Sequence, residues 1–381
     1  MLFRDIPGQE IIKKKLIHTV IEGRISHAQL FYGPEGSGKL ALALAYARYI
    51  CCESRNATDS CGTCHSCVKY NKFIHPDLHF VFPSVTGSKK EDNDESGETQ
   101  PNVNFHEKWR EALLENPYMD QFQWYEKIGL DTKQGLIGVK DSNEIIRKLS
   151  LKSYESDYKI LLMWLPERMN PTSANRLLKI IEEPPPLTLF LLVSENYGEI
   201  LPTILSRTQM VKIPAIKDAD IKKALIEKEN VPEDIANDAV HLANGNYNRA
   251  LSFIQPNENY KENFERFVNL MRSCYALKMT EILACVDDIF SLGRERQKLF
   301  LIYAMRMLRE NFLLNLGKVE ITHMTGYEND WSQNFFKFVD KDNVSGLYNE
   351  FNNAYNHISA NAYARIVLLD MCLNIYKLLR K

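Results

Sequence analysis

Hydrophobic positions follow a fixed order of patterns near the N-terminus. In residues 11–21 apolar side chains recur every four positions, which predicts an amphipathic helix. The apolar run Ala28–Tyr32 predicts a short buried strand, and the Ala/Leu-rich residues 40–50 predict another helix. Between the strand and the second helix lies the glycine-rich segment 33–39. Strand, glycine-rich loop and helix in this order are typical of a phosphate-binding loop.

Strand-like and helix-like segments continue to alternate up to about residue 214. Asn170 and Pro171 provide an N-cap and a helix-starting proline, and the prolines at 184–186 end that helix. The other predicted elements are strands at 78–82, 159–165 and 189–193 and a helix at 142–149. Repeated βα units predict a mostly parallel sheet with helices on both faces.

An insertion interrupts this alternation at about residues 84–135. Its first part is polar and acidic and offers almost nothing to bury, so we expect it to be disordered or a mobile insertion. Its later part carries Trp109, Phe122, Trp124 and Tyr125, which we expect to pack against the rest of the chain.

Beyond Pro214 the strand signals disappear and helical patterns take over. Three domains follow from this change. We expect an α/β core over 1–213, a small helical domain over 214–255 and an all-helical C-terminal domain over 256–381.

Composition and charge describe an ordinary globular chain. Of its 381 residues 45% are hydrophobic, and 47 Lys and Arg face 49 Asp and Glu, which excludes wholesale disorder. A net charge of −2 gives no protein-wide basic field, so the chain does not look like a free-standing DNA binder. The first twenty residues lack the pattern of a signal peptide, and no apolar run is long enough for a membrane span, so we expect a cytoplasmic protein.

Five of the eight cysteines crowd into residues 51–67. Cys52, Cys61, Cys64 and Cys67 have the spacing of a structural zinc site, in which four thiolates close the tetrahedron and leave no position for catalysis. Cys51 competes with Cys52 for the first ligand position, and His65 and His75 are weaker candidates.

The glycine-rich loop departs from the phosphate-loop pattern at one position. Gly33, Gly36 and Gly38 would let backbone amides surround phosphates, and Lys39 would add a cation, so ATP or ADP could bind. The pattern requires Ser or Thr where Leu40 stands, and that hydroxyl normally binds Mg²⁺. A glycine turn without a ligand is the alternative.

The strand that should carry the catalytic carboxylates lacks them. It ends with Trp164 and Leu165, and the nearest acid, Glu167, lies further along the loop. Together with Leu40 these residues predict a chain that does not hydrolyse ATP. Arg207, which follows a short helical turn, is by itself most simply a surface or ion-pairing residue.

Four segments together resemble one known family. They are the strand and loop that begin at His27, the four-cysteine cluster, the string NRLLKIIEEPP at 175–185 and the Leu-Ser-Arg string that ends at Arg207. This combination resembles the bacterial DNA polymerase III clamp loader, an AAA+ family, over about residues 1–255 apart from the insertion. The resemblance implies an AAA+ core, a lid domain and a C-terminal collar domain for oligomerisation.

Within that family, gamma/tau chains hydrolyse ATP and delta prime chains are catalytically inert. A gamma/tau chain would have Thr in place of Leu40 and an acidic pair in place of Trp164 and Leu165, so this chain is more similar to delta prime. The resemblance assigns to Arg207 an arginine finger that reaches, in trans, the ATP of a neighbouring subunit. It also makes Arg249 a weak match to the sensor 2 arginine and places residues 7–9 beside the adenine.

The resemblance further implies partners. They are the gamma/tau and delta subunits, and indirectly the sliding clamp and primer-template DNA, with no membrane. Two alternatives remain at this point. One is an active gamma/tau-like ATPase that recruits Lys39 and Glu167, and the other is a zinc module that binds nucleic acid outside replication. Only a few basic and aromatic residues follow the cysteines, which is thin support for the latter.

Overall fold

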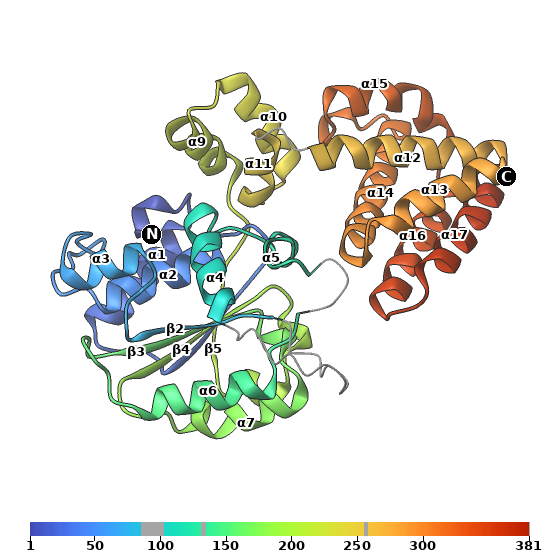
Figure 1. Cartoon of the computed structure of the whole chain (residues 1–381). Coiled ribbons are helices and arrows are strands. Elements are labelled where there is room, and N and C mark those ends of the chain that lie inside the picture. The colour runs from blue at the N-terminus through green and yellow to red at the C-terminus, as the bar shows by residue number, and fades with distance from the viewer. Residues whose placement is uncertain (85–102, 131–134, 255–257, 381) are drawn as a thin grey trace. The chain divides into compact units, whose positions relative to one another are not determined.

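The computed structural model describes residues 1–84, 103–130, 135–254 and 258–380 (Figure 1). The acidic first part of the insertion therefore lies outside the described residues, apart from Ser84. The chain divides into two compact units, one formed by residues 1–130 and 134–251 and the other mainly by residues 252–381. The division of the first unit into a core and a lid domain stays a prediction.

A five-stranded parallel sheet in the order β2-β3-β4-β1-β5 forms the centre of the first unit. The strands are β1 (Ala28–Tyr32), β2 (Leu78–Val81), β3 (Lys159–Trp164), β4 (Thr188–Ser194) and β5 (Gln209–Lys212). Every residue of β3 and β4 is buried, which matches their nearly continuous apolar sequences. The predicted α/β fold class is confirmed.

Helices cover both faces of this sheet (Figure 1). On one face lie α1 (Glu10–Ile21) and α2 (Lys39–Ile50), and on the other α6 (Val139–Ser150) and α7 (Pro171–Glu182). The α7 helix begins as predicted, because the Asn170 side chain accepts a hydrogen bond from the Ser173 amide and Pro171 takes the first helical position. The first unit also contains α3 (His65–Asn71), α8 (Pro202–Leu205), α9 (Asp218–Glu229), α10 (Glu233–Ala243) and α11 (Tyr247–Ile254).

The later part of the insertion is folded. It forms α4 (Val103–Glu115) and α5 (Gln121–Ile128), which pack against each other. Trp109 and Trp124 are fully buried, and their ring centroids lie 5.0 Å apart. The Trp124 indole also donates a hydrogen bond to the carbonyl oxygen of Pro83 at 2.8 Å. The prediction that the aromatic residues of this region pack is confirmed for these two.

The second unit is entirely helical in the part that the structure describes. It contains α12 (Glu258–Ala276), α13 (Met279–Ser291), α14 (Arg294–Asn315), α15 (Gly326–Phe335), α16 (Val344–Ser359) and α17 (Ala364–Leu379). Its interior includes the buried carboxylate of Glu328, which accepts hydrogen bonds from Tyr303 at 2.6 Å and from Arg306. A buried charge of this kind needs such partners to offset its lost hydration.

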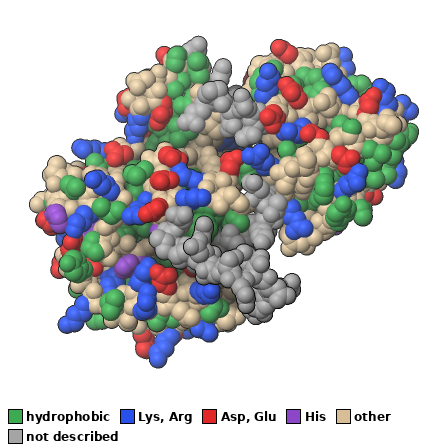
Figure 2. Space-filling model, viewed as in Figure 1, with side chains coloured by type: hydrophobic (Ala, Val, Ile, Leu, Met, Phe, Trp, Pro, Cys, Tyr) green, Lys and Arg blue, Asp and Glu red, His purple; other side chains and the backbone are tan. Residues whose placement is uncertain are grey.

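Positive and negative side chains are interspersed over the face that Figure 2 shows. Within the described residues, no helix is both long and apolar enough to span a lipid bilayer.

Candidate functional site

The glycine-rich loop joins the end of β1 to the start of α2. Gly36 and Gly38 have φ angles of +66° and +84°, a region that glycine adopts without strain. Gly33 is required for another reason, since a Cβ atom there would lie 2.0 Å from the carbonyl oxygen of Ile213. The backbone thus has the shape of a phosphate loop at a helix N-terminus.

The cation of this loop is engaged within the protein. Lys39 is buried, and its Nζ donates a hydrogen bond of 2.6 Å to the carbonyl oxygen of Pro34 in the same loop. Burial lowers the pKa of Lys39, while the carboxylates of Glu195, Glu35 and Glu167 act in the opposite direction. Lys39 therefore lies among acidic side chains.

The positions that would bind a metal ion are apolar. Leu40 and Trp164 are buried and line the pocket beside the loop. Glu167, the nearest acid in sequence, accepts hydrogen bonds from the backbone amides of Glu195 and Asn196 at 2.9 and 3.1 Å. These bonds give Glu167 a structural role in the turn after β4.

Two acids near the loop were not predicted from the sequence. Glu195 follows β4 and lines the pocket, and removal from water raises the pKa of its carboxyl group to about 8. Asp120 is the N-cap of α5, and removal from water raises its pKa to about 7. Parallel strands end at one edge of a sheet, so the position of Glu195, two residues after the predicted strand at 189–193, was the available signal.

The four predicted cysteines come together at the other end of α2. The sulfur atoms of Cys52, Cys61, Cys64 and Cys67 all lie within 4.8 Å of one another. Backbone amides point at these sulfurs, with the Cys64 amide 3.2 Å from the Cys61 sulfur and the Cys67 amide 3.4 Å from the Cys64 sulfur. The amides of Thr63 and Cys64 lower the pKa of Cys61 to about 6, whereas burial raises the pKa of Cys52 to about 12 and also raises that of Cys64. The donor set and its spacing fit a tetrahedral zinc ion.

The three competing ligands lie elsewhere. The Cys51 sulfur accepts a hydrogen bond from the Tyr70 hydroxyl at 3.2 Å, and burial raises the pKa of this thiol to about 11. The His75 ring packs on Tyr70, and the exposed His65 faces Glu155. None of the three belongs to the group of converging ligand atoms found among the described residues.

Arg207 lies between α8 and β5, at the surface. Its Nε and one terminal nitrogen each lie 2.9 Å from the Glu182 carboxylate, and its other terminal nitrogen donates to the Thr203 carbonyl oxygen at 2.9 Å. Glu182 is the last residue of α7, within the predicted string at 175–185. Arg207 is not among the residues that line the pocket of the glycine-rich loop.

The weaker predicted elements meet the glycine-rich loop. Gln9 donates hydrogen bonds to the carbonyl oxygens of Ser37 at 3.1 Å and Pro214 at 2.6 Å. At the start of α11 the amide of Tyr247 donates to the Gly36 carbonyl oxygen at 3.1 Å. Arg249 follows two residues later on α11.

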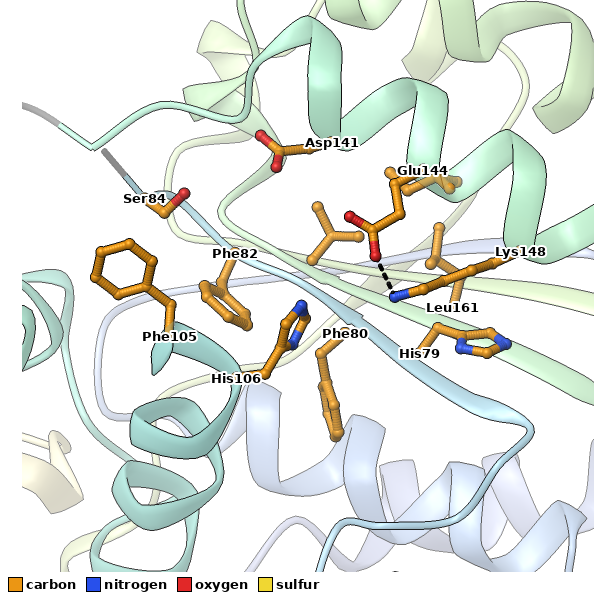
Figure 3. Close-up of a pocket in the computed structure, with 12 residues that line it drawn as sticks. His79, Phe80, Phe82, Ser84, Phe105, His106, Asp141, Glu144, Lys148 and Leu161 are labelled. Carbon is orange, nitrogen blue, oxygen red and sulfur yellow. Dashed lines mark ion pairs between the residues drawn. The ribbon is translucent and has the colours of Figure 1, made fainter. Parts of the chain in front are cut away.

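A separate small cavity of about 50 Å³ lies beside β2 and α6 (Figure 3). His79 and His106 line it beside the Lys148–Glu144 ion pair of 2.6 Å. Burial, and next the charge of Lys148, lowers the pKa of His79 to about 4 and that of His106 as well. The cavity has room for a few water molecules and is far smaller than a typical ligand pocket, so we assign it no ligand.

Residues 8–217 match the family model described as DNA polymerase III, delta subunit, which covers more than half of the chain. The chain belongs to this family. The chain is similar to the delta prime subunit of Bacillus subtilis, with 28% identity over 224 residues that cover 59% of this chain and 53% of that protein. It is also similar to the delta prime subunit of Yersinia pestis, with 28% identity over 196 residues that cover 51% of this chain and 43% of that protein.

Proteins with other names are also similar to this chain. The gamma/tau subunit of Mycobacterium tuberculosis is 27% identical over 206 residues, covering 54% of this chain and 27% of that protein. The crystal structure of a DNA polymerase III gamma subunit-related protein from Thermotoga maritima aligns with a TM-score of 0.45 and 15% identity, covering 97% of this chain and 100% of that one. The matches to the curated relatives span about half of their length or less.

Proposed function

We propose that this chain is a delta prime-like subunit of the DNA polymerase III clamp loader and does not hydrolyse ATP in its own pocket. Family membership and the similarity to delta prime chains support the first part. The second part is supported by Leu40 and Trp164, because apolar side chains occupy the positions where a hydroxyl and a carboxylate would hold Mg²⁺.

In this proposal Arg207 acts in trans on ATP bound by a gamma/tau-like neighbour. The observation that carries it is the position of the guanidinium, which lies at the surface, away from the chain's own pocket, and is oriented by Glu182. A planar guanidinium stabilises the charge that develops on a transferring phosphoryl group. The delta subunit would complete the assembly. The assembly would then load the sliding clamp onto primer-template DNA.

The test is the ATPase rate of a reconstituted assembly that contains the Arg207→Ala variant. We expect a loss on the order of 10³-fold at the site this chain completes, since arginine fingers contribute about that much in other phosphoryl-transfer enzymes. The variant chain itself should fold and assemble normally, because its ion pair with Glu182 is exposed to solvent.

The matched control is Arg176→Ala, which removes another surface arginine from the neighbouring helix α7. Equal ATPase rates for the Arg207→Ala and Arg176→Ala assemblies would reject the role of Arg207. The alternative of a gamma/tau-like ATPase predicts MgATP turnover by the isolated chain that disappears in Lys39→Ala.

We also propose that Cys52, Cys61, Cys64 and Cys67 hold a structural Zn²⁺ ion. Four converging thiols leave no open coordination position, so the ion would stabilise the segment from the end of α2 to α3 and take no part in a reaction. A site of this kind supplies folding energy to residues that have little apolar core of their own.

A further inference from the structure

A segment of the insertion lies in the pocket of the glycine-rich loop. Residues 116–120 connect α4 to α5, and Pro117, Tyr118 and Met119 line the pocket together with Gly38 and Lys39. Tyr118 is buried, and its ring lies 3.3 Å from the point that a Cβ atom on Gly38 would occupy. The side chain thus reaches the backbone of the phosphate loop.

Little space remains around Tyr118. The cavity there has a volume of about 20 Å³. That volume admits about one water molecule, whereas ligand pockets usually measure about 300 Å³ or more. A nucleotide triphosphate and Tyr118 cannot occupy this pocket together.

The same segment is bonded to the first turn of α11. The Tyr118 and Tyr247 rings meet edge to face with centroids 4.8 Å apart. The Asn116 side-chain amide donates to Asn248 at 2.7 Å, and the Asn248 amide donates to the carboxylate of Asp120 at 3.3 Å. Asn248 is buried, so these bonds form in a place where an unpaired amide would be costly.

The other side of the segment is fixed by the aromatic helices. Trp109 of α4 packs on Trp164 with ring centroids 5.1 Å apart, and on Phe82 at 4.5 Å. Trp164 stands at the end of β3, where a metal-binding carboxylate would otherwise be expected. Trp164 therefore leaves the strand end without a carboxylate and also provides a contact surface for the insertion.

Carboxyl groups and a backbone carbonyl oxygen already surround Lys39. Glu195 lines the pocket, Asp120 caps α5, and Glu35 of the glycine-rich loop accepts a hydrogen bond from Asn246 at 3.3 Å. Burial raises the pKa of Glu195 to about 8 and that of Asp120 to about 7, so these two groups carry little or only partial negative charge near neutral pH. A phosphate would have to compete with the Pro34 carbonyl oxygen for the buried Lys39.

We propose that residues 116–120 take the place of the nucleotide permanently, filling the phosphate loop and fastening α11 to it without any ligand. The chain would then hold its 247–251 region in a ligand-like position at all times, whatever the ATP concentration. This inference goes beyond the proposed function and does not depend on Arg207.

Hydrogen exchange measured by mass spectrometry on the full chain tests it. In Tyr118→Ala we expect amides in residues 36–42 and 244–251 to exchange at least about tenfold faster, because loss of a buried aromatic ring costs more than the free energy of a tenfold change. Tyr118→Phe keeps the ring and should exchange like the wild type. Tyr154→Ala, which removes an exposed tyrosine, is the matched control.

Wild-type exchange in the same peptides should not change when millimolar MgATP or MgADP is added. Nucleotide-induced protection of residues 36–42 in the wild type would overturn the proposal, since the segment would then have to leave the pocket. Equal exchange in Tyr118→Ala and Tyr154→Ala, with unchanged exchange in β3 and β4 showing that both variants are folded, would also overturn it. Neither result bears on Arg207, which is tested separately in the assembly.

Discussion

The glycine-rich loop and the four-cysteine cluster lie at the two ends of α2, and they differ in what occupies them. At the N-terminal end, the glycine-rich loop has the backbone of a phosphate site, but protein side chains fill its pocket, and its lysine donates a hydrogen bond to the Pro34 carbonyl oxygen. At the C-terminal end, four thiols converge on one point with ligand atoms within 4.8 Å of one another. Protein side chains fill the site of one motif, and the other presents four thiols that could hold a metal ion. A motif therefore indicates backbone geometry, and the surrounding elements decide what it binds.

The largest effect should come from substituting two of the four clustered cysteines. We expect Cys61→Ser combined with Cys64→Ser to abolish binding of about one Zn²⁺ per chain and to unfold residues 52–67, because structural zinc contributes about 10 kcal/mol or more of apparent binding free energy in small zinc domains. Elemental analysis and thermal unfolding measure this.

Cys285→Ser is the control for that experiment, since Cys285 lies on α13 in the other unit. A wild-type chain that is fully folded and free of metal would contradict the zinc site and remove the contrast between the two ends.

The next effect concerns the packing of α4, which fixes the segment in the pocket of the glycine-rich loop. Trp109→Ala should lower the free energy of unfolding by about 3–5 kcal/mol, because it removes a fully buried ring that contacts Phe82, Trp124 and Trp164. Urea unfolding measures the change. Leu114→Ala on the same helix removes an exposed side chain and should shift stability by less than about 0.5 kcal/mol. Similar losses in both variants would show that α4 does not depend on this contact.

The smallest effect is the pH dependence of the unfolding free energy that Glu195 causes in the pocket of the glycine-rich loop. The pKa of Glu195 is raised from 4.5 to about 8 by removal from water, so the folded state binds more protons than the unfolded state between these values. Stability must therefore fall as pH rises from about 4.5 to about 8. Glu195→Gln should flatten that fall by about 1 kcal/mol or more, measured as unfolding free energy at both ends of the window. The exposed Glu227→Gln should leave the slope unchanged, and parallel curves for the wild type and Glu195→Gln would contradict the assignment.

Local patterns were sufficient for the elements and for residues close together in sequence. The strand, loop and helix around Gly33 and the N-cap at Asn170 follow from composition and spacing within a few residues. The cysteines could be selected because three of them lie within seven residues and direct their sulfurs inward through tight turns.

The contents of the phosphate-loop pocket could not be derived in this way. Tyr118 lies about eighty residues from Gly38, and nothing in its own neighbourhood indicates which pocket it enters. The aromatic character of Trp109 predicts that it packs against the rest of the chain but does not indicate its partner. In the sequence, Trp164 indicates only that a carboxylate is missing, and its contact with Trp109 becomes visible in the structure. Contacts between distant segments depend on how the sheet assembles, so the sequence of either segment alone does not predict them.

The aromatic contact at the end of β3 also limits which substitutions the chain tolerates. An acidic residue introduced in place of Trp164 would leave a carboxylate beside Trp109 without hydration or a cation, at a cost of several kcal/mol. A carboxylate at this strand end would therefore require a compensating change in α4. The two tryptophans thus couple the composition of the strand end to that of the insertion.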